Sequence, residues 1–148
     1  MRVSRAFADM DAEGSSFVDG VTTQDVTSAG KAVSNKLTWL TDYAGETAQA
    51  DRPRVAAIAG DQFVVVWERW TGSDDRESDF GGTHGLLVGA DGVVKLPSKM
   101  LSQRHLPRGD DLVSLGSRAL YVSGSASSKR LTLNLIGADL NLEVVEIP

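Results

Sequence analysis

The sequence predicts an all-β protein built from repeated four-stranded antiparallel sheets, and three observations support this prediction. Short runs rich in β-branched and aromatic residues recur along the chain. Glycine and aspartate lie between these runs, where tight turns are expected, and Asp91-Gly92 is the strongest hairpin signal. The order of runs in 55–91 returns in 112–139. We therefore expect a single domain over 1–148, with repeats at about 50–101 and 107–147 and a partial repeat at about 1–21.

The composition is that of a globular protein that can bury a core. The chain has 148 residues, of which 41% are hydrophobic and 24% charged. Its net charge of −5 disfavours a nucleic-acid partner. The absence of cysteine excludes disulfides, thiolate metal sites and a thiol nucleophile. Because Asp9 precedes any apolar stretch and no window is long enough for a membrane span, we expect a soluble protein without a signal peptide. The composition indicates no compartment.

The first third of the chain combines strand-like and helix-like patterns. Val3–Met10 alternates weakly and predicts a strand, and Ser15–Gly20 is a candidate return strand. Apolar residues then recur at intervals of three and four, which favours one short helix near 24–36. Gly30 and several weak helix formers disfavour that helix, so a helix and a non-helical segment both stay open. Leu37–Tyr43 alternates Leu, Trp and Tyr with polar residues, as a strand does.

The central hairpin is the most apolar stretch of the protein. Val55–Ile58 and Phe63–Trp67 predict two antiparallel strands joined at Gly60-Asp61. In the second strand Phe63, Val65 and Trp67 would point to one face and the intervening valines to the other. A strand that is apolar on both faces must be covered on both faces.

The remaining runs follow the same order with one interruption. Residues 72–82 are polar and predict an exposed loop, and 98–111 predict a connector. Two further strand candidates follow the central hairpin, and four follow the connector. The predicted strands are Gly85–Ala90, Val93–Leu96, Asp111–Gly116, Arg118–Gly124, Leu131–Gly137 and Leu140–Ile147.

The repeated pattern resembles β-propeller proteins of bacterial type. The apolar strand that ends in Trp67 and the hairpin at Asp91-Gly92 carry this resemblance, which covers about residues 50–147. No WD, kelch or Asp-box signature is present. Propellers typically close with about four to eight blades, and this chain offers two and a partial third. Either several chains complete a ring or the sheets form a β-sandwich or barrel, and the chain could also be a fragment of a longer propeller. We expect a homo-oligomer, most simply a symmetric dimer.

The acidic loop is a candidate cation site. Asp75, Glu77 and Asp79 place carboxylates at alternating positions before glycines, as calcium-binding loops do. Gly81 comes one position late for an EF-hand, and no distal glutamate has the expected spacing. A solvated loop is the alternative. No other cofactor is indicated.

The aromatic residues suggest a ligand surface beside this loop. Trp67 is expected in the core, whereas Trp70 lies at a strand end next to the acidic loop, where it could contact a saccharide or another small molecule. The full set of candidate ligand-binding residues is Trp70, Asp75, Glu77, Asp79 and His84.

Catalysis is the competing interpretation. His84 and His105 are the two histidines, and with Asp110 and Asp111 they could form a hydrolase or lyase site. The spacing of these four residues in the sequence does not require them to meet in one site. No nucleophile elbow, zinc-protease or dinucleotide motif is present. We assign no catalytic residue. The sequence therefore predicts a non-catalytic binding or assembly module with a glycan, small-molecule or cation ligand, and a hydrolase or lyase is the alternative.

Overall fold

The computed structural model of the protein describes residues 3–7, 22–26, 38–41, 43, 48–71, 77–109, 111–125 and 130–147. These residues form three antiparallel sheets and one short 3-10 helix, η1 (Glu77–Asp79). The described part is thus all-β, as predicted. It contains no helix with the length and apolar character needed to cross a bilayer.

The first sheet has the order β1-β2-β3. Strand β1 (Val3–Phe7) pairs with β2 (Thr22–Val26), which pairs with β3 (Thr38–Trp39). The helix predicted near 24–36 is wrong over 24–26, because pairing with β1 gives these residues an extended backbone. The rest of that prediction, and the return strand predicted at 15–20, lie outside the described residues.

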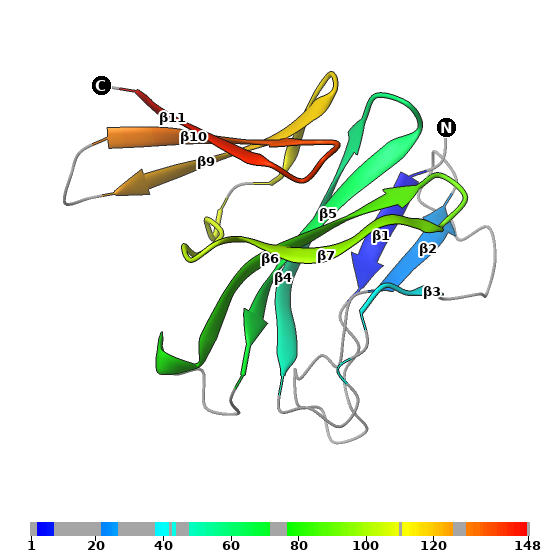
Figure 1. The fold of residues 1–148 in the computed structure, drawn as a ribbon, viewed down its shortest axis with the longest axis horizontal. Coiled ribbons are helices and arrows are strands. Elements are labelled where there is room, and N and C mark those ends of the chain that lie inside the picture. The colour runs from blue at the N-terminus through cyan, green and yellow to red at the C-terminus, as the bar shows by residue number, and fades with distance from the viewer. Residues whose placement is uncertain are drawn as a thin grey trace.

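The second sheet is a meander with the order β4-β5-β6-β7 (Figure 1). It consists of β4 (Gln49–Ile58), β5 (Gln62–Trp70), β6 (Phe80–Gly89) and β7 (Val94–Ser102). Val64, Val65 and Trp67 in β5 have no exposed surface, which confirms that this strand is covered on both faces. The predicted loop and connector are wrong at 80–82 and 98–102, because β6 begins at Phe80, which pairs with Trp70, and β7 continues to Ser102, which pairs with Thr83.

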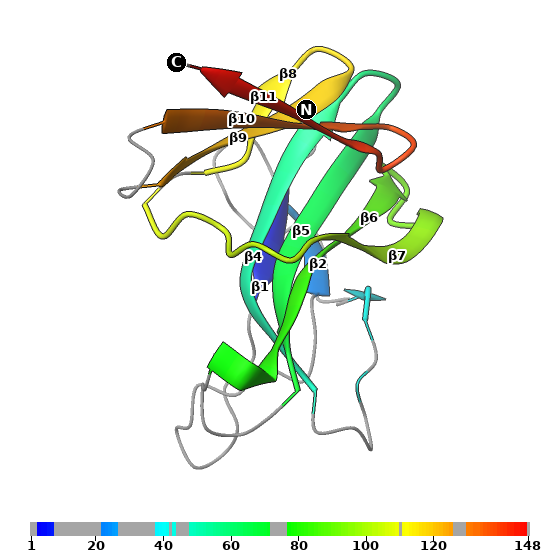
Figure 2. The same ribbon diagram turned by 60° about the vertical axis from the view of Figure 1, so that its left-hand side comes forward.

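The third sheet is a second meander, with the order β11-β10-β9-β8. It consists of β8 (Val113–Leu115), β9 (Arg118–Ser125), β10 (Arg130–Gly137) and β11 (Leu142–Ile147). Figure 2 shows this sheet lying across one end of the second sheet. A backbone hydrogen bond of 2.9 Å from Ala59 N–H to the Gly116 carbonyl joins the turns of the two sheets.

Two hydrophobic cores lie on opposite faces of the second sheet. Val64 and Val66 on one face pack with Tyr121 and Ile136 of the third sheet. On the other face Trp67 and its neighbours pack with Leu40 and Tyr43, and the Trp67 indole N–H donates a 2.9 Å hydrogen bond to the Tyr43 hydroxyl. The second sheet is therefore the middle layer of the described structure.

The first strands of the three sheets lie side by side. Strand β4 contacts β1 and also contacts β8. In the described residues the sheets close into neither a barrel nor a ring, so the propeller-like arrangement stays a prediction.

Candidate functional site

The predicted cation ligands are placed only in part. Asp75 lies outside the described residues, and Glu77 is described by its backbone within η1. The Asp79 carboxylate accepts a hydrogen bond from the Ser78 hydroxyl, and its carbonyl accepts one of 2.7 Å from Thr71 N–H. Within the described ranges no three His, Asp or Glu side chains come together in a way that could hold a metal ion. Calcium binding stays a prediction.

Trp70 lies inside the protein rather than on its surface. Its exposed fraction is 8%, and its ring packs edge-on against Phe80 with centroids 5.3 Å apart. The His105 ring stacks on Trp70 at 5.5 Å and also contacts Phe80. The Trp70 indole N–H is buried and has no hydrogen-bond acceptor among the described residues. Trp70 therefore does not present an open ring face on which a ligand could stack.

A buried carboxylate that sequence reasoning missed lies beside this ring cluster. Glu68 has no exposed surface, and both its oxygens accept hydrogen bonds from Arg52 Nη1, at 2.9 and 3.0 Å. The same carboxylate accepts a 2.7 Å hydrogen bond from Leu106 N–H and lies 3.4 Å from His105 Nδ1. These contacts fasten the connector to β5. The single carboxylate in the mainly apolar run 63–70 was the signal that could have revealed it.

A bulge in β4 brings Arg52 to this carboxylate. The pairing of β4 with β5 shifts between Asp51 and Arg54, and Arg52 has a φ of 51°. Pro53 lacks an N–H and is tolerated at such a bulge on an edge strand. Beyond the bulge, Arg54 donates hydrogen bonds to the Pro107 carbonyl and the Asp111 carboxylate. Arg54 therefore holds the connector against β4 directly, whereas Arg52 acts on it through Glu68, which binds Leu106.

The two histidines belong to different surroundings. The His84 ring lies 6.1 Å from the Trp67 ring, and its Nε2 is 3.3 Å from the Gly81 carbonyl. Burial lowers the pKa of His84 from its usual 6.5, the contact with Gly81 opposes this, and Arg69 adds to the lowering. Because His105 faces Glu68 and His84 faces a backbone carbonyl, these contacts do not supply the pair of carboxylates around one histidine that a hydrolytic site would need.

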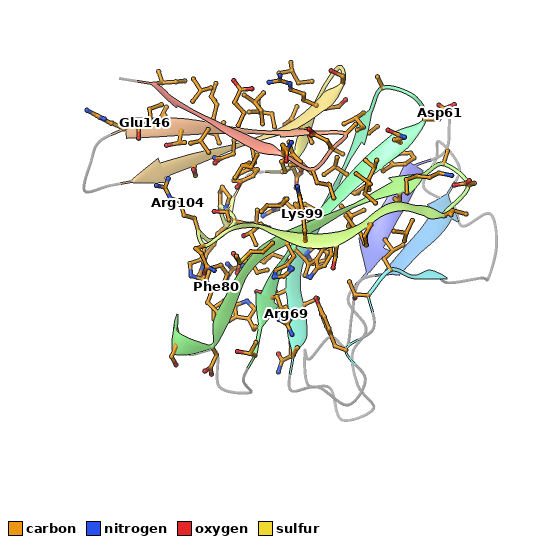
Figure 3. All side chains as sticks on the ribbon, viewed as in Figure 1. Asp61, Arg69, Phe80, Lys99, Arg104 and Glu146 are labelled. Atoms are coloured by element: carbon orange, nitrogen blue, oxygen red, sulfur yellow. The ribbon has the colours of Figure 1, made fainter. Side chains whose placement is uncertain are left out.

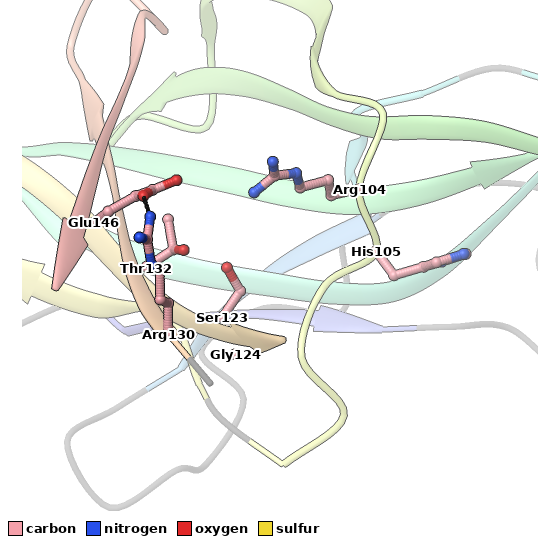
Figure 4. A pocket seen from close by; sticks show the side chains of 7 residues that line it. All are labelled: Arg104, His105, Ser123, Gly124, Arg130, Thr132 and Glu146. Carbon is pink, nitrogen blue, oxygen red and sulfur yellow. Dashed lines mark hydrogen bonds and ion pairs between the residues drawn. The ribbon is translucent and has the colours of Figure 1, made fainter. Parts of the chain in front are cut away.

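A cavity of about 590 Å³ lies between the connector and the third sheet. Figure 3 places Arg104 and Glu146 on the same side of the molecule, away from Asp61. In Figure 4 the Arg104 side chain points toward Arg130 and Glu146, whereas the His105 ring points away from them. The cavity is lined by Arg104, His105, Ser123, Gly124, Arg130, Thr132 and Glu146.

The third sheet also has an apolar outer face, which we define as the face opposite the core. Strand pairing puts Leu131 with Ile147, Leu133 with Val145, and Val113 with Leu120 on this face. Several of these side chains are more than one-third exposed. The exposed members are Val113 (55%), Leu115 (54%), Leu131 (53%), Ile147 (39%) and Val145 (38%).

Comparison with known proteins shows partial similarity to bacterial enzymes. No family model matches the chain, and no solved structure matches it. The chain is 35% identical over 92 residues to the polyribonucleotide nucleotidyltransferases of Mycobacterium avium strain 104 and Mycobacterium tuberculosis strain H37Rv. This similarity covers 62% of the chain but only 12% of each enzyme. The chain thus spans a small part of the length of these relatives.

Proposed function

We propose that this chain is a non-catalytic binding and assembly module that associates with a second copy of itself through the outer face of the third sheet. The observation that carries the proposal is the row of exposed apolar side chains on that face, which includes Val113, Leu131 and Val145. Contiguous exposed apolar surface of this kind marks interaction sites in soluble proteins. Core residues cover both faces of β5 and β6 in the neighbouring second sheet, whereas these apolar side chains of the third sheet are exposed in the described part of the chain.

A propeller-like arrangement suggests how the second copy would dock. The first strand of each blade lies nearest the axis of a propeller, and in this chain β4 contacts both β1 and β8, the first strands of the adjacent sheets. The sheet that follows the third in such a series would cover its outer face. Two copies with three sheets each would form a ring of six, within the usual range of about four to eight. The occupant would then be the first sheet of the second copy.

The mass of the protein in solution tests this proposal. Size-exclusion chromatography with light scattering over a wide concentration range should give twice the mass of one chain. Val145→Lys should shift the protein to the monomer, because a lysine cannot be buried cheaply in an apolar interface. Val144→Lys is the matched control, since Val144 is the adjacent residue of the same strand, is 49% exposed and points away from the outer face. This variant should remain a dimer.

Two results would contradict the proposal. A wild-type chain that stays monomeric at every concentration does not use the face for self-association. A dimer that Val144→Lys and Val145→Lys weaken equally uses another surface. The catalytic alternative, a hydrolase or lyase, gains no support from the contacts of His84 and His105 described above.

A further inference from the structure

We propose that the cavity between the connector and the third sheet binds an anionic small molecule, with Arg104 as the residue that holds its phosphate or carboxylate group. The cavity volume of about 590 Å³ falls within the range of small-molecule sites, roughly 300–1,000 Å³. The Arg104 guanidinium points across this space (Figure 4). In the part of the chain that the structure describes, it forms no ion pair.

The charges around the cavity leave one positive group without a counter-charge. Arg130 is also positive, but its Nη1 donates a 2.8 Å hydrogen bond to the Glu146 carboxylate, which neutralises it. Arg104 is the remaining charge among the lining residues. A guanidinium presents paired N–H donors that match the two oxygens of a carboxylate or phosphate. The net charge of the lining therefore favours an anion over a cation.

The opposite wall offers hydroxyl groups that could bind the rest of the ligand. The amide of Asn134, which is 3% exposed, donates a 2.9 Å hydrogen bond to Ser123 Oγ. Because that bond uses Ser123 Oγ as an acceptor, its own O–H proton stays available for a ligand oxygen. Thr132 adds a second hydroxyl residue to the same wall. A ligand that matches these residues has one anionic group and several hydroxyls or ring oxygens. Nucleotides and acidic sugars have this composition.

The backbone that carries Arg104 is fixed in place. Thr83 Oγ1 donates a 2.7 Å hydrogen bond to the Arg104 carbonyl, and Arg104 N–H donates one of 3.0 Å to Ser102 Oγ. Two residues later, Leu106 N–H is held by the buried Glu68 carboxylate. The position of the Arg104 backbone would therefore be set before a ligand binds, which reduces the entropy cost of binding.

Calorimetric titration with matched pairs of ligands tests the inference. We would titrate the full chain with adenosine 5′-monophosphate and adenosine, and with glucuronate and glucose. At least one anion should bind at least about tenfold more tightly than its neutral partner. Arg104→Gln should weaken that binding about 10- to 100-fold, as expected for the loss of a charge-assisted contact. Arg108→Gln is the matched control, because Arg108 is an exposed arginine of the same connector that does not line the cavity.

Three kinds of outcome would overturn the inference. The first is equal binding of an anion and its neutral partner, or no binding of either anion at millimolar concentration. The second is equal weakening by Arg104→Gln and Arg108→Gln. The third is binding of a short single-stranded RNA without binding of the small anions, which would indicate a polynucleotide surface. Circular dichroism melting of both variants controls for folding. Val145→Lys should bind the anion as the wild type does, so this test is independent of self-association.

Discussion

Asp91 and Asp139 hold the same kind of turn in two different sheets. Each carboxylate accepts a 3.0 Å hydrogen bond from the backbone N–H two residues later, on Val93 and on Asn141. Each turn also has the sequence Gly-Ala-Asp and joins the last inner strand to the edge strand of its meander. Aspartate at this position replaces the backbone as acceptor and thereby closes the turn. The two carboxylates differ in their second partner.

We predict that both carboxyl groups titrate at a pKa below their usual 3.8 and that one substitution separates them. A side-chain hydrogen bond from Lys95 is the largest cause of the lowered pKa of Asp91, and the backbone N–H of Asn141 is the largest for Asp139. Lys95→Met should therefore raise the pKa of Asp91 and leave that of Asp139 unchanged. Carbon-detected NMR titration of the carboxyl groups measures both values, and an equal response of the two would contradict these assignments.

The lowered pKa of each aspartate also determines the direction in which stability changes with pH. The stabilisation is present above pH 3.8 and is lost as the pH falls through the folded-state pKa, because the unfolded chain binds the proton more readily. Asp139→Asn should reduce the loss of stability in this acidic range. Urea unfolding at pH 5 and at pH 3 measures it, and an unchanged pH dependence would refute the contribution of the turn.

At Leu140, substitution by glycine should destabilise the protein less than substitution by alanine, which is the reverse of the usual order. The corresponding turn residue in the second sheet is Gly92, with a φ of 78°, whereas Leu140 adopts a φ of 58° and is 2% exposed. Leu140→Ala should cost about 2–5 kcal/mol because it removes core packing. Leu140→Gly should cost about 1 kcal/mol less than the alanine variant, because glycine relieves the left-handed backbone. Chemical denaturation measures both values.

Leu106 provides the control for this comparison. It is also 2% exposed, but its φ is not positive. There glycine should cost more than alanine, since it loses more backbone entropy on folding. The same order of costs at Leu106 and Leu140 would show that backbone strain at Leu140 is negligible.

The ion pair of Arg52 with Glu68 should be much more sensitive than a surface pair. Arg52→Met leaves a carboxylate with no exposed surface and without its counter-charge, which typically costs about 3–5 kcal/mol. Adding Glu68→Gln should recover part of that loss. Arg118→Met breaks an exposed pair with Glu143 and should cost about 1 kcal/mol or less. Urea unfolding of the four proteins measures these differences, and similar costs at Arg52 and Arg118 would contradict the buried role of Glu68.

His84 should make the protein less stable in mild acid. Burial lowers its pKa below 6.5, so the unfolded chain takes up a proton more readily than the folded chain. The free energy of unfolding should be highest above pH 6.5 and should fall as the pH decreases toward the folded-state pKa. His84→Gln should reduce the difference in that free energy between pH 7.5 and pH 5.5. A variant with the full wild-type difference would exclude His84 as its source.

The local sequence pattern was sufficient to predict the structure where the apolar or polar character of the side chains indicates which of them are buried. The apolar residues of Phe63–Trp67 predicted a strand with two covered faces, and Asp91-Gly92 predicted a hairpin. Both predictions are confirmed. It failed over 24–26, where apolar spacing suits a helix but pairing with β1 makes a strand. It also missed the end of β7, an exposed edge strand whose extent depends on backbone hydrogen bonds rather than on apolar side chains.

The sequence by itself determined an all-β chain, its central hairpin and its Asp-Gly turn, because these depend on residues that are neighbours along the chain. Tertiary structure alone decided that Arg52 and His105 meet Glu68, and that Arg104 faces the third sheet across a cavity. These residues are far apart in sequence, and their types have no fixed spacing. Only the packing of the two meanders, together with the bulge in β4, brings them within reach of one another.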